Sequence, residues 1–421
     1  MKRLLSIIFL ILLIIFFFLY FKKEEDVIEN EKKLEIVLEK ELVNITDYYV
    51  YGNHFNIEGN INLNNSDIKN YSLILKNSKK EIKLDCIFQN KDNSITFKTS
   101  DYINKGINLD DLKIGNWSLF IKYQDDNTNK YYGFINNTNY DDIEYYTITK
   151  NNTNNKINII FDKNNNFVNF IVKKSSLPDD VYDITIDPGH GGVDTGASGR
   201  YEGVIYNEAD LTLKIAIQLK KDLEKNGYKV KLTRENDMDI DNYGDTGRSV
   251  IPNKYHSKLC LSLHLNSGNS EMSYGGLEIY TPNDVDYSLA RLLASNLSSV
   301  LDVSKKKFNR IENGIYFNGF TKESIQELNE QYLKQKYNIY DIKIGAPEMF
   351  MIREVGGKAT YAYVDGRNSK HGKNIFYNSN QTAESYLLEL GYITYSNDLK
   401  KIIEKGNLIS EQIKKAITDY Y

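Results

Sequence analysis

The chain has 421 residues, enough for two or three domains that each bury a core of their own. Its formal net charge is −4 and it has no long basic stripe, which argues against nucleic acid as a partner. Its two cysteines, Cys86 and Cys260, are too few for a disulfide framework, and Cys260 is expected to be a buried free thiol because it lies in the apolar run KLCLSLH.

The first 22 residues are predicted to form an uncleaved signal anchor. Residues 4–21 are apolar apart from one serine and one tyrosine, and at ~1.5 Å per residue a helix of this length spans ~27 Å, about one bilayer. Lys22 and Lys23 follow directly, without the small residues of a cleavage site. A very short tail ahead of a large domain favours the bulk being outside, so we expect a single-pass protein of the cell membrane that is mostly extracytoplasmic.

Residues 23–46 are predicted to form a stalk or linker, and residues 47–176 a β-sandwich-like domain. The first segment mixes charged residues with Val, Leu and Ile, a pattern that does not choose between a short helix and a first strand. Beyond it, short alternating runs such as YSLILK, GNWSLFIKY and NKINIIF are separated by Asn, Asp and Gly clusters, as in a sandwich of short strands. Trp117 is expected in the core, with a surface position for sugar stacking as the alternative.

Residues 177–421 predict an α/β domain with a mostly parallel sheet flanked by helices. A strand is expected over 181–186, where Tyr182, Ile184 and Ile186 occupy alternate positions. The runs YKVKLT and LCLSLH predict further strands, and helices are expected at about 287–301 and 397–420. Strands that alternate with helices are typical of this fold class.

The clearest helix is predicted in the segment NEADLTLKIAIQLKKDLEKNG. Asn207 is the expected N-cap, with Asp210 three residues later, and Gly227 is expected to end the helix. Its apolar residues recur four apart on one face: Leu211, Ile215, Leu219 and Leu223.

The segment TIDPGHGG, residues 185–192, places a histidine on a glycine-rich turn. Pro188 removes a backbone donor, and the three glycines permit backbone angles and close approaches that a side chain would forbid. His190 is therefore expected at the carboxyl end of a strand, where open α/β sheets bind their ligands. This stretch alone leaves open the alternative of a turn histidine without a role.

A second histidine, His264, also stands where an apolar strand gives way to a loop. Two such histidines and one carboxylate would complete the three protein ligands of a catalytic zinc ion, with a fourth position left for water. Glu208, in the first turn of the helix after the glycine loop, is the predicted third ligand, and Glu202 is a weaker candidate. The alternative for Glu208 is a solvated residue that caps the helix N-terminus.

Glu389 interrupts the apolar run SYLLELGYI, residues 385–393, which otherwise reads as a buried strand. An unpaired buried carboxylate costs several kcal/mol, on the order of 2–7 for an unpaired polar group, so a compensating partner is expected. A metal-bound water and a salt bridge to a lysine or arginine are the two candidates.

Six motifs in one order resemble the zinc-dependent N-acetylmuramoyl-L-alanine amidases of bacterial cell-wall turnover. The resemblance covers roughly residues 179–421. The motifs are DPGHGGVDTGASG (187–199), NEADLTL (207–213), LTREND (232–237), Arg248 with Asn253, SLHLN (262–266) and LELGYI (388–393).

The resemblance implies one Zn²⁺ in the catalytic domain, with His190, Glu208 and His264 as its ligands and Glu389 as the catalytic carboxylate. In such a site zinc polarises the scissile carbonyl and lowers the pKa of its bound water to ~7. The carboxylate passes the water's proton to the leaving amine. The bond cut would join the lactyl group of N-acetylmuramic acid to the L-alanine of peptidoglycan. Substrate contact or structural support is expected of three further residues: Arg234, Arg248 and Asn266.

Two departures from the family pattern stand out. Lys258 occupies a position where the family often has an aspartate. Residues at about 305–381 are longer than a minimal domain needs and predict an insertion that serves as a substrate-recognition loop, a regulatory lid or a dimer contact. Within it, His371 is a weak candidate for the open zinc position.

Other functions remain open at this point. The same ligands would serve a zinc peptidase or deacetylase that acts on another cell-wall amide. A catalytically silent wall-binding scaffold is a third reading, against which the intact set of two histidines and two glutamates speaks. The β-sandwich is expected to be a spacer, a wall-binding module, or the site of a regulatory protein or wall polymer.

Overall fold

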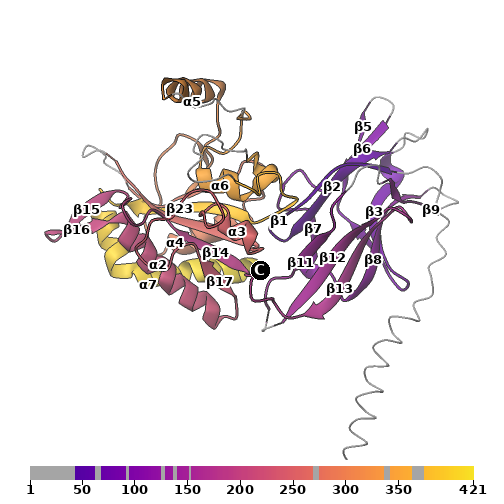
Figure 1. Ribbon diagram of the computed structural model, residues 1–421, viewed down its shortest axis with the longest axis horizontal. Coiled ribbons are helices and arrows are strands. Elements are labelled where there is room, and N and C mark those ends of the chain that lie inside the picture. Colours follow the sequence, from indigo (N-terminus) through magenta and orange to yellow (C-terminus); the bar gives the residue numbers. More distant parts are fainter. Residues whose placement is uncertain are drawn as a thin grey trace, which may run out of the picture.

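The computed structural model describes residues 43–61, 68–91, 94–124, 129–135, 140–150, 153–268, 275–335, 342–362 and 374–421. The predicted signal anchor, residues 23–42 of the predicted stalk and His371 lie outside these residues. Within the described ranges, no helix is long and apolar enough to span a membrane. The described chain forms two bodies side by side, an all-β body and an α/β body (Figure 1).

Residues 43–175 form two mainly antiparallel sheets. The first has the order β10-β1-β2-β6-β5 with β7 beside β2, and the second has the order β11-β12-β13-β8-β3-β4 with β9 beside β8. The first sheet contains β1 (Val43–Tyr51), β2 (His54–Ile61), β5 (Ile87–Lys91), β6 (Ser94–Lys98), β7 (Ile107–Asn108) and β10 (Phe134–Ile135). The second contains β3 (Tyr71–Lys76), β4 (Glu81–Leu84), β8 (Gly115–Gln124), β9 (Asn129–Tyr132), β11 (Ile143–Tyr146), β12 (Asn154–Asp162) and β13 (Phe167–Ser175). Short 3-10 turns lie at Ile68–Asn70 and Leu109–Asp111.

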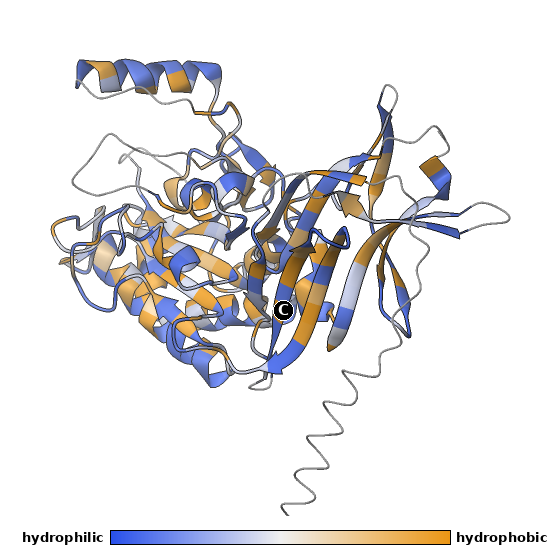
Figure 2. Ribbon diagram, turned by 45° about the vertical axis from the view of Figure 1, so that its right-hand side comes forward, coloured by the Kyte–Doolittle hydropathy of each residue, from blue (hydrophilic) through white to orange (hydrophobic). Residues whose placement is uncertain are grey.

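One core lies between these two sheets, as alternation along the strands requires. Successive strand residues point to opposite faces, and Figure 2 shows hydrophobic and hydrophilic residues alternating along the long strands. Trp117 of β8 is 3% exposed within this core, and its Nε1 donates to the carbonyl oxygen of Lys113 at 2.8 Å. The surface position considered for Trp117 is therefore wrong. Strand β1 begins at Val43, so the first sheet of the sandwich already includes residues 43–46, ahead of the start predicted at residue 47.

The α/β body is built on a seven-stranded sheet with the order β17-β14-β18-β23-β19-β21-β20. Neighbours from β17 to β23 are parallel, and β23 pairs antiparallel with β19. The strands are β14 (Ile184–Pro188), β17 (Val230–Leu232), β18 (Leu259–Asn266), β19 (Glu278–Tyr280), β20 (Arg310–Glu312), β21 (Ile315–Tyr316) and β23 (Glu384–Tyr392). A separate hairpin joins β15 (Ser198–Tyr201) and β16 (Val204–Asn207). The predicted mostly parallel sheet is present.

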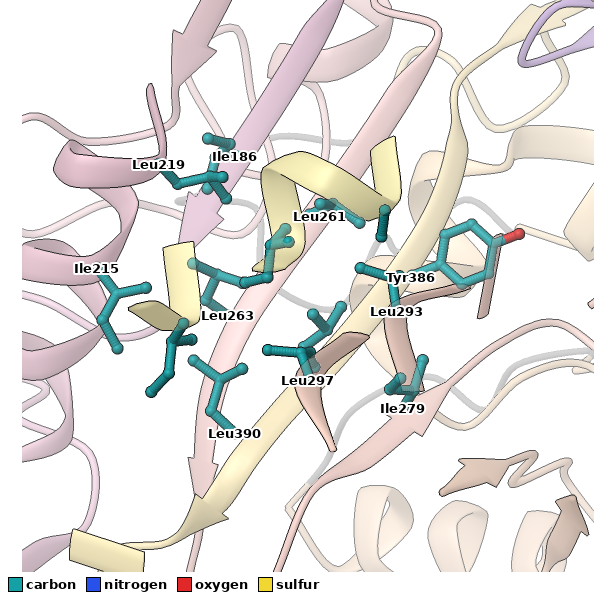
Figure 3. Close-up of a cluster of buried hydrophobic side chains, with 14 of the residues drawn as sticks. Ile186, Ile215, Leu219, Leu261, Leu263, Ile279, Leu293, Leu297, Tyr386 and Leu390 are labelled. Carbon is teal, nitrogen blue, oxygen red and sulfur yellow. The ribbon is translucent and has the colours of Figure 1, made fainter. Parts of the chain in front are cut away.

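Helices cover both faces of this sheet. On one face, α2 (Glu208–Lys225), α4 (Ser288–Leu297) and α7 (Ser396–Tyr420) bury their apolar sides against strand residues such as Ile186, Leu263 and Leu390 (Figure 3). On the other face lie α3 (Ile251–Lys254) and α6 (Phe350–Val355). Helix α2 buries the four residues predicted for its apolar face. Asn207 occupies the N-cap position, but its side chain makes no capping hydrogen bond, and the helix ends at Lys225.

The described parts of residues 305–381, the predicted insertion, contain regular secondary structure. Strands β20 and β21 extend the sheet, α6 packs against β23, and β22 (Gln381–Thr382) joins the first sheet of the sandwich. Helix α5 (Lys322–Lys334) projects away from both bodies (Figures 1 and 2). Strands β20, β21 and β22 have only two or three residues each, which is too few to show an alternating pattern in the sequence.

The two bodies share a buried polar interface. Strand β22 pairs in parallel with β1, which aligns Tyr51 with Thr382. The Nδ2 of Asn104 donates to Oε1 of the fully buried Glu384 at 2.8 Å, and the backbone N–H of Ser385 donates to the Tyr51 hydroxyl at 3.1 Å. Both Glu384 and Ser385 begin β23, so the sandwich holds the start of a central strand of the α/β sheet.

Lys258 belongs to the same interface, which accounts for its departure from the family pattern. It is buried, and its Nζ lies 5.7 Å from the ring centroid of Tyr145 in the sandwich and 3.4 Å from the carbonyl oxygen of Tyr182. Burial lowers the pKa of this ammonium, while the nearby Asp183 and Asp110 carboxylates oppose that effect. The lysine therefore faces the sandwich rather than the pocket at the other end of β18.

We expect Asn104→Ala to destabilise the whole protein. The substitution removes a donor from the buried Glu384 carboxylate, and an unsatisfied buried group costs about 1–3 kcal/mol. The midpoint of thermal unfolding of residues 43–421 should fall by several degrees. The exposed Asn116→Ala, on the sandwich surface, should stay within about 0.5 kcal/mol of the parent. Equal midpoints for the two variants would show that the interface adds no stability.

Candidate metal centre and active site

The glycine turn after β14 brings His190 toward His264. His190 itself has a φ of 60°, in the left-handed region that only a few non-glycine residues adopt. A Cβ atom on Gly189 would lie 2.3 Å from Cε1 of His264, so only glycine allows the second imidazole to lie against this turn. The two imidazole centroids are 5.0 Å apart with an interplanar angle of 77°.

Both imidazoles converge on one carboxylate oxygen. Nε2 of His190 lies 3.1 Å from Oε1 of Glu208, and Nδ1 of His264 lies 2.9 Å from the same oxygen. The ligand atoms of these three residues all lie within 4.8 Å of one another. Two imidazole nitrogens and one carboxylate oxygen form a donor set that zinc takes in catalytic sites, so the residues fit the ion.

Glu208 is held in place by the backbone. It is 3% exposed, and the backbone N–H groups of Leu265 and Ala197 donate to Oε1 and Oε2 at 2.9 and 3.0 Å. Burial raises its pKa, but the hydrogen bonds from the two histidines outweigh burial and hold the pKa well below the usual range. The alternative of a solvated capping residue is wrong, because the side chain lies inside the protein.

His190 is oriented from its other nitrogen. Nδ1 lies 2.9 Å from Oδ2 of Asp194, and a carboxylate can only accept, so this nitrogen carries a proton. The bond to Glu208, with a smaller contribution from Asp194, raises the pKa of the metal-free imidazole to about 9. When Nδ1–H donates to Asp194, Nε2 is left facing the place where a cation would bind.

Glu389 lies opposite His264 in the ladder between β18 and β23. Its Oε2 is buried and has no hydrogen-bond partner within the described residues. Burial is the main cause that raises the pKa of this carboxyl to about 7. The salt bridge considered for Glu389 is therefore absent from the described part of the chain.

A second buried glutamate supports this region, and sequence reasoning missed it. Glu278 of β19 stands opposite Glu389 in the antiparallel ladder. Its oxygens accept from the hydroxyls of Tyr280 and Tyr392 at 2.7 Å and from Nζ of Lys306 at 3.1 Å. No pattern in the sequence distinguishes Glu278, because β19 has only three residues.

The two arginines hold the glycine turn through its backbone. Arg234 is buried and donates to the carbonyl oxygens of Pro188, Gly189 and Ala209 at 2.8–3.1 Å. Arg248 donates to the carbonyl oxygen of His190 at 2.9 Å and forms an ion pair with Asp187 at 3.0 Å.

Asp187 also accepts hydrogen bonds from the hydroxyls of Thr233 and Ser262 at 2.7 Å. Burial raises its pKa, and Arg248 and these hydroxyls bring the pKa below the ordinary value. Sequence reasoning gave no role to Asp187 or Asp194, although both stand in the glycine motif.

Two residues considered in the sequence lie outside the group of candidate metal ligands. Glu202 is exposed in the turn between β15 and β16, which excludes it as the third ligand. Asn266 accepts from the backbone N–H of Ser267 at 2.8 Å, and its Nδ2 lies 3.5 Å from Oε2 of Glu278. Both contacts lie at the end of β18, next to Glu278.

His190, His264 and Glu389 line one pocket of about 670 Å³. One wall comes from the glycine turn and residues 239–242, and the other from α6 with the residue before it and from β23. The lining comprises His190, Gly191, Val193, Asp194, Asp239, Ile240, Asp241, Asn242, Arg248, His264, Met349, Phe350, Met351, Leu387 and Glu389.

Residues 184–330 match the family model described as N-acetylmuramoyl-L-alanine amidase. The chain carries a domain of this family. The matched residues include His190, Glu208 and His264, whereas Glu389 lies beyond them.

Relatives of this amidase domain include the germination-specific N-acetylmuramoyl-L-alanine amidase of Bacillus subtilis (strain 168), 32% identical over 156 residues. That match covers 34% of this chain and 64% of the relative, so the chain spans less than two thirds of that protein. A putative N-acetylmuramoyl-L-alanine amidase of Buchnera aphidicola is 27% identical over 241 residues, 56% of this chain and 95% of the relative. The solved structure of the N-acetylmuramoyl-L-alanine amidase AmiC2 of Nostoc punctiforme is 22% identical in sequence. The match covers 57% of this chain and 96% of that chain, with a TM-score of 0.36.

Zinc binding by the amidase domain should depend on pH. Because the metal-free His190 imidazole has a pKa of about 9, a metal ion must displace a proton from it at neutral pH. The apparent zinc affinity should rise about tenfold per pH unit from neutral pH and level off above the pKa. Competition with a chromophoric chelator measures this. An affinity independent of pH in this range would contradict the proton on His190.

Asp194→Asn should weaken zinc binding without removing a ligand. The bond that orients His190 is weakened, and losing such an outer partner typically costs about 10–100-fold in metal affinity. Asp210→Asn, an exposed change of the same size in the first turn of α2, should leave the affinity unchanged. Equal affinities of the two variants would show that Asp194 does not position His190.

Proposed function

We propose that the protein is a zinc-dependent hydrolase of peptidoglycan that cuts the amide bond between N-acetylmuramic acid and L-alanine. The observation that carries this proposal is the convergence of His190, Glu208 and His264 beside Glu389, whose buried Oε2 has no partner among the described residues. All except Glu208 line one pocket, so a substrate amide can reach them together. The amidase family match over residues 184–330 supports this bond as the substrate.

His190, Glu208 and His264 would hold the zinc ion. Bound there, zinc would polarise the scissile carbonyl and make a water molecule more acidic. Glu389 would then move the proton: its carboxylate accepts the proton from the attacking water and delivers it to the leaving nitrogen. A carboxyl whose pKa is about 7 suits both transfers, because it can accept and give up a proton near neutral pH.

Backbone contacts keep the pocket rigid during the reaction. Arg234 and Arg248 fix the glycine turn that carries His190, and the backbone N–H of Leu265 fixes Glu208. These groups are in place before a substrate arrives, so little reorganisation accompanies the reaction.

The cellular setting is part of the same proposal. The apolar run over residues 4–21 supports a single-pass location in the cell membrane with the amidase domain outside, where peptidoglycan lies. A CwlD amidase from Clostridioides difficile has been solved in complex with the GerS lipoprotein. For this chain, a regulatory protein or wall polymer at the β-sandwich remains a proposal.

Glu389→Gln should abolish hydrolysis while zinc remains bound. The amide cannot take up and return the proton, and loss of general acid–base catalysis costs about 10²–10⁴-fold in rate. Residues 43–421 with zinc should release N-terminal L-alanine amines from purified peptidoglycan, detected by mass spectrometry, and a chelator should stop the release.

The matched control is Glu411→Gln, an exposed change on α7, which should keep the parental rate. Bound zinc without any release by the parent protein would overturn the proposed activity. Release by the parent that persists unchanged in Glu389→Gln would overturn the role of this carboxylate.

A further inference from the structure

The pocket has an apolar wall next to Glu389. Leu387 and Glu389 share one face of β23, because Tyr386, Leu388 and Leu390 belong to the core on the other face. Both Leu387 and Glu389 line the pocket. Leu387 is 6% exposed, and it packs in a cluster with residues that include Ile352 of α6 and Met349. Met351 of α6 also lines the pocket.

The chemistry of the proposed function orients a substrate along this wall. The leaving nitrogen must lie at the Glu389 carboxyl group to receive its proton, whereas the scissile carbonyl lies toward the candidate metal ligands. The side chain on the amine component is therefore near Glu389 and away from His190 and Glu208. On the Glu389 face of β23, Leu387 lines the pocket and Gly391 does not, so the side chain lies toward Leu387.

We infer that Leu387, Met349 and Met351 form the subsite for the side chain of the first peptide residue after the scissile amide. This inference rests on the proposed function and adds the selectivity for the first peptide residue. None of the three side chains has a polar hydrogen, so the subsite selects by size rather than by hydrogen bonding. A methyl group fits against the wall, a hydroxymethyl group leaves its hydroxyl without a partner there, and a branched side chain collides with Leu387.

The magnitudes follow from the nature of the wall. An apolar pocket discriminates an added methylene by about 10–200-fold and an added hydroxyl by up to about a hundredfold. L-serine, whose hydroxyl finds no partner on this wall, should be cleaved with a kcat/KM up to about a hundredfold below that of L-alanine. L-valine should be slower than L-alanine by about tenfold or more.

The test uses residues 43–421 loaded with zinc and three synthetic disaccharide dipeptides, with L-alanine, L-serine or L-valine before D-isoglutamine. Amine release gives kcat/KM for each. Leu387→Ala should reduce the alanine-to-valine ratio about tenfold by making room for the branched side chain. Met349→Ala, at a partly exposed position, should shift the ratio in the same direction without emptying the core.

Ile240→Ala is the matched control, because it removes a similar apolar volume from the opposite wall of the same pocket. Its alanine-to-valine ratio should equal that of the parent. A parent protein that cleaves valine as fast as alanine overturns the inference, as does an unchanged ratio in both Leu387→Ala and Met349→Ala. Failure of the parent to release amine from any substrate, including peptidoglycan, overturns the proposed function, and the subsite falls with it.

Discussion

The two-residue period of three neighbouring strands is the constraint on which the rest of the amidase domain depends. In β14, β18 and β23, alternate residues such as Ile186, Leu263 and Leu390 face the helices α2, α4 and α7. The residues between them face the other way, and among these are His264 and Glu389. A slip of one position in any strand would exchange the two faces. Burial of the core and alignment of the reacting groups are therefore one and the same requirement.

Burying the charged and polar groups of the site costs free energy, and favourable interactions elsewhere in the fold must offset this cost. Glu208 is buried as an anion, and two imidazoles and two backbone N–H groups compensate it. In the part of the chain that the structure describes, Oε2 of Glu389 has no such compensation, a cost of about 1–3 kcal/mol for an unsatisfied buried group. Such costs are characteristic of functional sites, and they are borne by well-satisfied surroundings such as the network around Asp187.

Local patterns in the sequence were sufficient for elements whose signals are local. Spacing and motif predict the apolar face of α2, the buried Trp117 and the residues that meet at the candidate metal centre. What escaped prediction depends on distant partners. The sequence alone does not explain Lys258, because its neighbour Tyr145 belongs to the sandwich, more than a hundred residues earlier in the chain. Glu278 and the strands of residues 305–381 escaped because two or three residues show no period, and their partners lie elsewhere in the chain.

The pairing of β22 with β1 also sets an order of events during synthesis. Residues 43–51 emerge early, but the strand that covers one end of β1 comes only with residues 381–382. Until then, that end of β1 is an open edge able to pair with another chain. Contacts this distant in sequence form late and slow the folding of the whole. An incomplete chain would thus lack both the finished sandwich and the anchored start of β23, the strand that carries Glu389.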